Sequence, residues 1–170
     1  IVISLLKSQT TKLREKIARR TEELKQAFTI DKLTHLPNRL QLFEAQSKHD
    51  STSLALINID RFNEINEIYG THCGDQILQL VANEMVQWSI DKPVDMFKLH
   101  ADEFAVLINK DTEDMNLTDQ ALVENIFSHW IIELLDRIRV KHFNISNQTI
   151  QITVSSGIVV NSKNPNTEAD

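Results

Sequence analysis

The sequence predicts an α+β domain in which helices cover a central antiparallel sheet, preceded by a long N-terminal helix. The apolar run at 53–59 is typical of a buried strand. Two shorter apolar runs, at 96–99 and 104–108, alternate like the paired strands of a hairpin and enclose Asp102 and Glu103. Apolar residues recur at helical spacing between these runs and after them, which indicates helices that pack one face on the sheet.

The elements follow in a regular order. Residues 1–28 predict a helix, and the Pro/Asn turn in "THLPNR" ends it before helical spacing resumes in "RLQLFEAQSKH". The sequence then predicts strand 53–59, a short helix at 60–69, a loop at 70–75, a helix to residue 88, the hairpin, a helix at about 118–139 and a final strand at 149–160. This β-α-β-β-α-β order is that of a ferredoxin-like fold.

The N-terminal helix has an imperfect seam of the kind found in coiled coils. The seam positions, at alternating three- and four-residue steps interrupted by Arg20, are Leu6, Thr10, Leu13, Ile17, Leu24 and Ala27. The pattern fits either a parallel coiled coil that makes a homodimer or a single solvated helix.

Charge differs between this helix and the rest of the chain. Residues 1–25 carry a net charge of +4 and residues 26–170 a net charge of −10, an acidic body that argues against a nucleic-acid binder. The first six residues, "IVISLL", are far fewer than the roughly 20 that span a bilayer. Because basic residues follow them at once, the pattern is typical of the cytoplasmic end of a spanning helix and not of a signal peptide. We expect a cytoplasmic piece of a longer, membrane-anchored protein.

Composition excludes several classes of site. The chain has 170 residues, 41% of them hydrophobic and 25% charged, which is enough for one sizeable core. Cys73 is the only cysteine, so no disulfide framework is expected, and we predict that it is a buried apolar residue. The six histidines show no metal-ligand spacing.

The hairpin acids raise the question of phosphoryl-transfer chemistry. Enzymes of this kind hold magnesium with paired carboxylates, one from the end of the first strand and one from the hairpin. Asp102 and Glu103 supply the hairpin part. At the end of the first strand Asp60 is acidic, but Asn58, on the same face, offers only a neutral oxygen.

Four ordered motifs resemble the GGDEF family, the diguanylate cyclase domain. "DKLTHLPNRLQLF" is similar to the family's D-x-L-T-G-L-P-N-R, and "LALINIDRFNEINEIYGTHCGD" to its D-x-D-x-F-K-x-I-N-D…G-H…G-D segment. "KLHADEF" stands where the family has R-Y-G-G-D-E-F, and "ITVSSGIVV" resembles T-V-S-I-G-V-A. The resemblance covers about residues 31–160, so 29–170 would be the domain, without the family's last helix and its phosphate-binding Lys and Arg.

The resemblance implies roles for particular residues. The family condenses two GTP molecules into cyclic di-GMP across a dimer, with Mg²⁺ in each half-site. The matching metal positions are Asn58, Ile59, Asp102 and Glu103, of which Asp102 and Glu103 are also the catalytic positions. The matching substrate positions are Asn66 and Asp75 for guanine, and Asn63, Thr71, His100 and Ala101 near the phosphates.

The chain departs from the family where the chemistry lies. Asn58 replaces a metal carboxylate, Asn63 a lysine, Thr71 a histidine, and His100 and Ala101 the two glycines. Side chains in the turn would fill space that the triphosphate uses, and alanine at positive φ is strained. The positions of the family's product-inhibition motif R-x-x-D are "DKPV", 91–94, so cyclic di-GMP is not expected to bind there.

These departures predict a degenerate GGDEF domain with weak or absent Mg²⁺ binding and little or no cyclase activity. It would act as a regulatory, dimerising or GTP-sensing module of an inner-membrane-anchored bacterial protein, next to a C-terminal phosphodiesterase (EAL) domain. The alternative is a working diguanylate cyclase with Asp60 as a substitute metal ligand. In a third interpretation the domain senses GTP, which it binds without condensing. The retained residues also have a purely structural interpretation, in which Asp102 and Glu103 are solvated turn residues and Asn66 and Asp75 are cap or loop residues.

Overall fold

The computed structural model describes residues 11–21, 28–48, 51–108, 120–145 and 148–163. The chain divides into two compact units, Ile1–Ile30 and Asp31–Asp170. In the first unit residues 11–21 are helical, as predicted, and the seam residues Leu13 and Ile17 are more than half exposed. The other apolar seam positions lie outside the described residues. Within the described part of the chain, no helix is long and apolar enough to cross a membrane.

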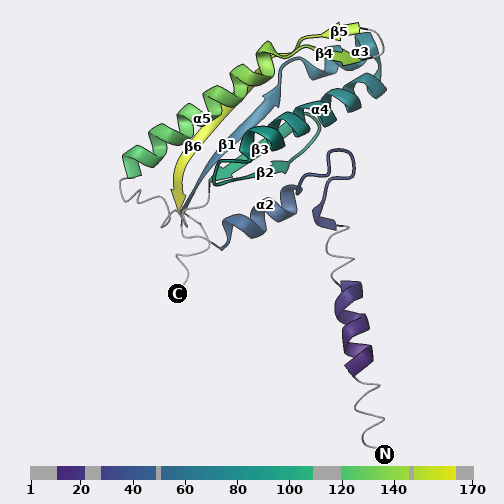
Figure 1. Cartoon of the computed structure of the whole chain (residues 1–170), viewed down its shortest axis with the longest axis vertical. Helices are drawn as coiled ribbons and strands as arrows, with labels where there is room; N and C mark the ends of the chain where they lie inside the picture. Colours follow the sequence, from purple (N-terminus) through teal and green to yellow (C-terminus); the bar gives the residue numbers. More distant parts are fainter. Residues whose placement is uncertain (1–10, 22–27, 49–50, 109–119, 146–147, 164–170) are drawn as a thin grey trace, which may run out of the picture. The chain divides into compact units, whose positions relative to one another are not determined.

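The second unit is built on a four-stranded antiparallel sheet in the order β2-β3-β1-β6 (Figure 1). Its strands are β1 (Ser51–Ile59), β2 (Val94–Lys98), β3 (Glu103–Ile108) and β6 (Val154–Lys163). The helices are α2 (Arg39–Gln46), α3 (Phe62–Tyr69), α4 (Thr71–Ser89) and α5 (Gln120–Val140). The α+β class and the β-α-β-β-α-β order of the main elements are confirmed.

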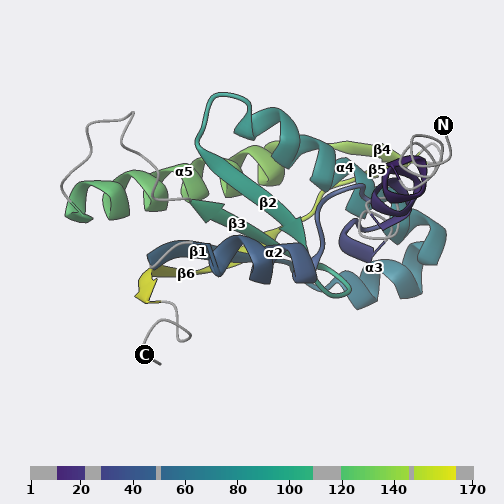
Figure 2. The same ribbon diagram turned by 90° about the horizontal axis from the view of Figure 1, so that it is seen from below.

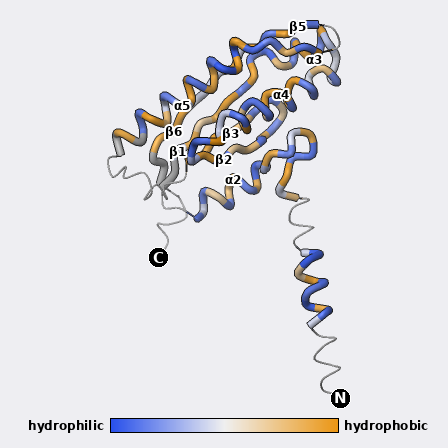
Figure 3. The backbone as a smooth tube through the Cα atoms, viewed as in Figure 1, coloured by the Kyte–Doolittle hydropathy of each residue, from blue (hydrophilic) through white to orange (hydrophobic). Residues whose placement is uncertain are grey.

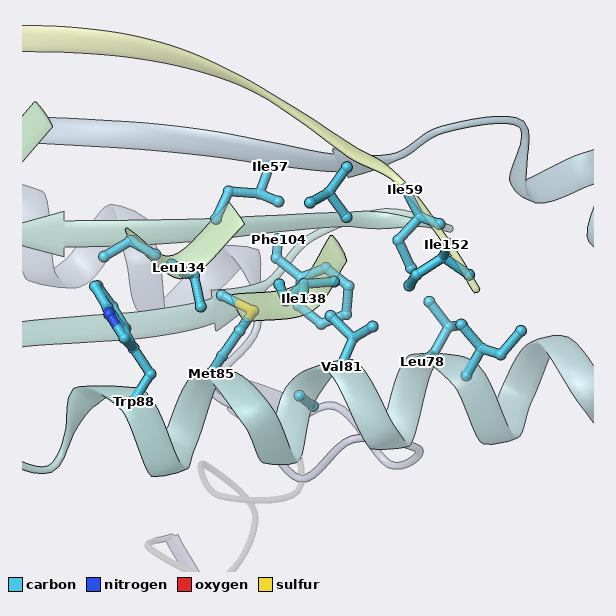
Figure 4. Close-up of a cluster of buried hydrophobic side chains, with 14 of the residues drawn as sticks. Ile57, Ile59, Leu78, Val81, Met85, Trp88, Phe104, Leu134, Ile138 and Ile152 are labelled. Carbon is cyan, nitrogen blue, oxygen red and sulfur yellow. The ribbon is translucent and has the colours of Figure 1, made fainter. Parts of the chain in front are cut away.

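Helices α4 and α5 cover one face of the sheet (Figure 2). Their apolar side chains recur at helical spacing, and Figure 3 shows this as alternating hydrophobic and hydrophilic bands along α5. In Figure 4, Leu78, Val81 and Met85 of α4 point toward the strands, where Ile57, Ile59 and Phe104 meet them. Ile57, Ile59, Val81, Met85 and Phe104 are at most 1% exposed, so the main core lies between the sheet and these two helices.

Helix α2 packs on the opposite face of the sheet, over β2 and β3. Leu42 of α2 forms a smaller buried cluster with Phe97, Ala105 and Leu107. Asn38 starts the helix, since its side chain accepts hydrogen bonds from the backbone N–H groups of Leu40 and Gln41. The predicted Pro/Asn turn followed by a helix is therefore confirmed.

Two details of the sequence prediction were wrong. The segment 70–75 was expected to be a loop, but α4 begins at Thr71 and only Gly70, at φ +86°, separates it from α3. The final strand was expected to run unbroken over 149–160. Instead, β5 (Gln148–Ile150) pairs with β4 (Phe143–Ile145), and β6 starts at Val154. Apolar residues alternate through both pieces, so the pattern could not show the break.

Candidate functional site

The end of β1 lies beside the turn that joins β2 to β3, as the sequence predicts. Asn58 is paired with Glu103 in the register of the two strands. One residue further on, the backbone N–H of Ile59 donates to the carbonyl of Asp102 at 3.3 Å. Strand pairing thus brings together the four positions that the sequence marks as metal ligands: Asn58, Ile59, Asp102 and Glu103.

The β2–β3 turn (residues 99–102) is a tight reversal closed by its own backbone. Leu99 N–H donates to the Glu103 carbonyl at 2.9 Å, and Glu103 N–H donates to the His100 carbonyl at 2.8 Å. Ala101 has a φ of +47°, in the left-handed region that favours glycine. The expected strain at this position is confirmed. The backbone favours glycine at Ala101 but not at His100, because His100 has no positive φ. Both side chains are exposed on the turn.

Asp60, which follows β1, is held by the strand on the other side. Its carboxylate Oδ1 accepts a hydrogen bond of 2.6 Å from the hydroxyl of Ser155, and its backbone N–H donates to Thr153 at 2.9 Å. Hydrogen bonds from Ser155 and Thr153 lower the pKa of Asp60. Burial opposes this shift, and the charges of Arg139 and Arg61 lower the pKa further by smaller amounts. The carboxylate is therefore already engaged with β6.

Ser155 was missed as a candidate site residue. It stands opposite Asn58 in the β1–β6 register, so Glu103, Asn58 and Ser155 form one row across three strands. The "TVSSG" motif contains it, but its neighbour Ser156 has the same chemistry. Only the strand register shows which of the two hydroxyls meets Asp60.

The hydrogen bond between Ser155 and Asp60 predicts a pH-dependent loss of stability in Ser155→Ala. Since the pKa of Asp60 is lower in the folded chain, its stabilisation is present above the unfolded pKa of about 3.9 and is lost as pH falls through the folded value. In this partly exposed site we expect Ser155→Ala to lower the free energy of unfolding by about 1 kcal/mol at pH 7 and by less than half of that at about pH 3. Urea unfolding at both pH values measures this difference.

Ser156→Ala is the matched control for that measurement. The Ser156 hydroxyl is buried and has no hydrogen-bond partner among the described residues. Its removal should therefore be neutral or slightly stabilising at both pH values. An equal loss at pH 7 and pH 3 in Ser155→Ala would contradict the role assigned to the Asp60 carboxylate.

The two predicted guanine-binding positions lie where α3 meets α4. A methyl group added at Gly74 would come within 2.0 Å of the Asn66 side-chain oxygen and 3.1 Å of the Phe62 ring. Asn66 therefore packs directly on the α4 backbone at Gly74, which is one residue before Asp75. Asn66 is half-buried and Asp75 exposed, so α3 and α4 place an amide beside a solvent-facing carboxylate.

The remaining predicted substrate positions are on the surface. Asn63 of α3 and Thr71, the first residue of α4, are exposed. Cys73 is buried, as predicted, and burial raises the pKa of its thiol. Among the described residues, no group of three or more His, Cys, Asp or Glu side chains is arranged to hold a metal ion.

A family model described as "Diguanylate cyclase, GGDEF domain" matches residues 27–170. The chain belongs to the GGDEF family. MucR of Pseudomonas aeruginosa, a bifunctional diguanylate cyclase/cyclic di-GMP phosphodiesterase, is 28% identical to this GGDEF chain over an alignment of 169 residues that covers 94% of the chain and 23% of MucR. Diguanylate cyclase DgcS of Shewanella oneidensis is 28% identical over an alignment of 116 residues that covers 64% of the chain and 39% of DgcS. The chain thus spans well under half the length of these curated relatives.

Solved structures share the fold of this GGDEF chain. The coiled coil and GGDEF domain of DgcB from Caulobacter crescentus, in complex with c-di-GMP, matches with a TM-score of 0.69 at 20% identity. The match covers 93% of this chain and 82% of the DgcB chain. The S helix-GGDEF-EAL structure of LapD from Vibrio cholerae, bound to c-di-GMP, matches with a TM-score of 0.62 at 20% identity. The match covers 88% of this chain and 33% of the LapD chain. At these identities the likeness concerns the fold alone.

Proposed function

We propose that this GGDEF domain serves cyclic di-GMP signalling as a regulatory or GTP-sensing module with little or no cyclase activity. The observation that carries the proposal is the neutral side chain of Asn58 opposite Glu103, directly before Ile59, whose backbone N–H donates to the carbonyl of Asp102. A carboxylate at this point would complete a cluster with the two hairpin acids. An amide supplies no charge to hold magnesium against a triphosphate.

The neighbouring groups do not replace the missing carboxylate. Asp60 is engaged by Ser155 on the β6 side, which argues against its use as a substitute metal ligand. The family uses Mg²⁺ to neutralise the triphosphate, and the residues here do not fit a full set of magnesium ligands. We therefore infer that Mg²⁺ binds weakly or not at all.

The turn adds a second obstacle to catalysis. Ala101 holds a left-handed conformation, and both His100 and Ala101 place side chains where the family has glycines. Losing a preorganised group at the transition state costs roughly 2–4 kcal/mol, and each 1.36 kcal/mol is a tenfold loss of rate. Two such losses leave little turnover. An active cyclase is the alternative, and the placement of Asp102 and Glu103 beside the end of β1 favours it.

The regulatory role needs partners beyond this domain. Leu13 and Ile17 are exposed on the N-terminal helix, which supports the proposal of a homodimer through that helix. Relatives that combine the domain with a phosphodiesterase or EAL domain, such as MucR and LapD, support the proposal of a C-terminal EAL neighbour. A cytoplasmic position next to an inner-membrane anchor also belongs to this proposal.

A titration followed by a turnover assay on the same sample tests the function. We expect no cyclic di-GMP to form from GTP with Mg²⁺. If Asn66 and Asp75 bind guanine, GTP binds with a dissociation constant on the order of 0.1–1 mM and ATP binds more weakly. Calorimetry measures the affinities and chromatography the product.

Two variants control the titration. Asp75→Ala should abolish the preference for GTP, while Asp91→Ala, at an exposed acid just before β2, should leave it unchanged. Clear product that disappears in Asp102→Ala would show a working cyclase. Equal binding of GTP and ATP would show that the guanine site no longer functions.

A further inference from the structure

A short segment leads into β6 without being part of a strand itself. Residues 151–153, here called the lead-in, lie between β5 and β6. The Thr153 carbonyl nevertheless accepts a hydrogen bond from the backbone N–H of Asp60, and Ser155, just beyond the lead-in, donates its hydroxyl to the Asp60 carboxylate. Whatever fixes the lead-in therefore also fixes Asp60.

Packing alone does not hold the lead-in against α3. A cavity of about 230 Å³ is lined by Gln151 and Thr153 of the lead-in and by Glu64 and Ile68 of α3. Of the three lead-in side chains only that of Ile152 is buried, whereas those of Gln151 and Thr153 are exposed. Hydrogen bonds must therefore supply the order that close packing supplies elsewhere in the domain.

Arg139, in the last turn of α5, makes such hydrogen bonds at both ends of the lead-in. Its guanidinium Nη2 donates to the Val154 carbonyl at 3.3 Å, and its own carbonyl accepts a hydrogen bond from the side-chain amide of Gln151 at 2.8 Å. Nη1 also lies 3.6 Å from the carboxylate of Asp136, three residues earlier on α5. A single residue thus joins the end of α5 to the start of β6.

The direction of the backbone carbonyls shows why this contact concerns Asp60. Successive carbonyls of a strand point to opposite edges. The Thr153 carbonyl points toward β1, where the Asp60 N–H meets it, so the Val154 carbonyl points to the outer edge of β6. Among the described strands none lies on that edge, and Arg139 occupies it at Val154. Asp60 and Arg139 therefore hold opposite edges of the same two residues.

We propose that Arg139 is a positioning residue that fixes the start of β6 and thereby keeps the Asp60 carboxylate on the Ser155 side of the β1 end. Asp60 is the acid at this end of β1 that could replace the carboxylate missing at Asn58, so its position decides whether a substitute magnesium ligand exists there. The inference rests on the proposed function, in which Asp60 is not such a ligand, and it names the residue that keeps Asp60 away.

Arg139→Met tests this role, because methionine keeps the length of the side chain but cannot donate hydrogen bonds. Two adjacent amides of the full chain report on opposite sides of β1. The Asp60 N–H donates to the Thr153 carbonyl on the β6 side, and the Ile59 N–H donates to the Asp102 carbonyl on the turn side. We expect hydrogen exchange, measured by NMR, to rise about tenfold at Asp60 and less than about twofold at Ile59.

Three further variants separate the contacts of Arg139. Arg139→Lys keeps a charged donor and should raise exchange at Asp60 by less than about threefold. Gln151→Met removes the donor at the other end of the lead-in and should raise this exchange by about three- to fivefold. Arg137→Met is the matched control, since Arg137 lies two residues earlier on α5 but pairs with Glu84 of α4 at 3.1 Å. It should leave exchange at Asp60 unchanged.

The carboxyl signal of Asp60 distinguishes positioning from a general loss of order. At a fixed neutral pH, the ¹³C chemical shift of this carboxyl reports whether Ser155 still donates to it. In Arg139→Met the signal should move toward the position that it has in Ser155→Ala. In Arg139→Lys it should return most of the way to its position in the parent.

The proposal is overturned if exchange at Asp60 in Arg139→Met stays within about twofold of the parent, or if exchange at Asp60 and Ile59 rises together. The second result would mean that the whole end of β1 has loosened. If Arg139→Met does not fold, Gln151→Met decides the outcome, and exchange at Asp60 within about twofold of the parent then contradicts the proposal. No nucleotide or metal is present in this experiment, so its failure is distinct from a failure of the titration with GTP.

Discussion

Four substitutions made together, Asn58→Asp, Asn63→Lys, His100→Gly and Ala101→Gly, are expected to give the chain its largest gain in cyclase activity. The aspartate restores a carboxylate opposite Glu103, and the lysine restores a cation on α3. The glycines clear the turn and relieve the left-handed strain at Ala101. Because these groups act on one transition state, their combined gain should far exceed that of any one change. Chromatography of cyclic di-GMP after incubation with GTP and Mg²⁺ measures it.

Partial reversions separate the causes of the inactivity. Asn58→Asp alone should strengthen Mg²⁺ binding without restoring turnover, since two side chains remain in the turn. His100→Gly with Ala101→Gly should open the turn, again without turnover. The strain that glycine relieves at Ala101 is offset by the backbone entropy that glycine adds to the unfolded chain at His100, which has no positive φ. Asn63→Lys alone should change neither. Full turnover from Asn58→Asp by itself would show that the turn glycines are dispensable.

Gly74→Ala should give the largest loss among single substitutions on the guanine side of the site. The added methyl group would lie 2.0 Å from the Asn66 side-chain oxygen, so Asn66 must rotate away or α3 must move from α4. Overpacking of this kind costs about 1–3 kcal/mol of unfolding free energy. The displaced amide should also remove any preference for GTP over ATP. Urea unfolding and calorimetric titration measure the two effects.

Gly157→Ala provides the control for this substitution. Gly157 lies in β6, has nothing within 4 Å of an added methyl group, and has no positive φ. Its replacement by alanine should leave both stability and nucleotide preference nearly unchanged. If Gly74→Ala behaves in the same way, Asn66 is not fixed against α4 and the guanine site is not preformed.

Local patterns predicted those parts of the molecule that periodicity and turn chemistry determine. The apolar run of β1, the helical spacing of α4 and the hairpin around Asp102 and Glu103 gave the α+β order, and the structure confirms them. The same patterns failed at Gly74, where a glycine usually indicates a loop. Here its missing side chain serves contact with Asn66 inside a helix.

Contacts between residues far apart in sequence were out of reach of such patterns. The hydrogen bond from Ser155 to Asp60 joins residues 95 positions apart and depends on the register of β6 against β1. Lysines are mostly exposed, so nothing in the sequence indicates that Lys98 is buried, and only the packing of the folded chain shows it. Strand register and burial of this kind are properties of the assembled sheet.

The position of β1 between β3 and β6 has a consequence for how the domain forms during synthesis. Strand β3 is complete when about half of the domain has been made, but β6 is the last strand of the sheet in chain order. Until β6 has left the ribosome, β1 is an edge strand with one row of unpaired backbone groups and with Leu56 on its surface. Contacts of such long sequence separation form late, because closing the long loop costs entropy before the contacts that stabilise it are made. The nascent domain therefore passes through a stage in which its central strand is open to pairing with another chain, and β6 ends that stage.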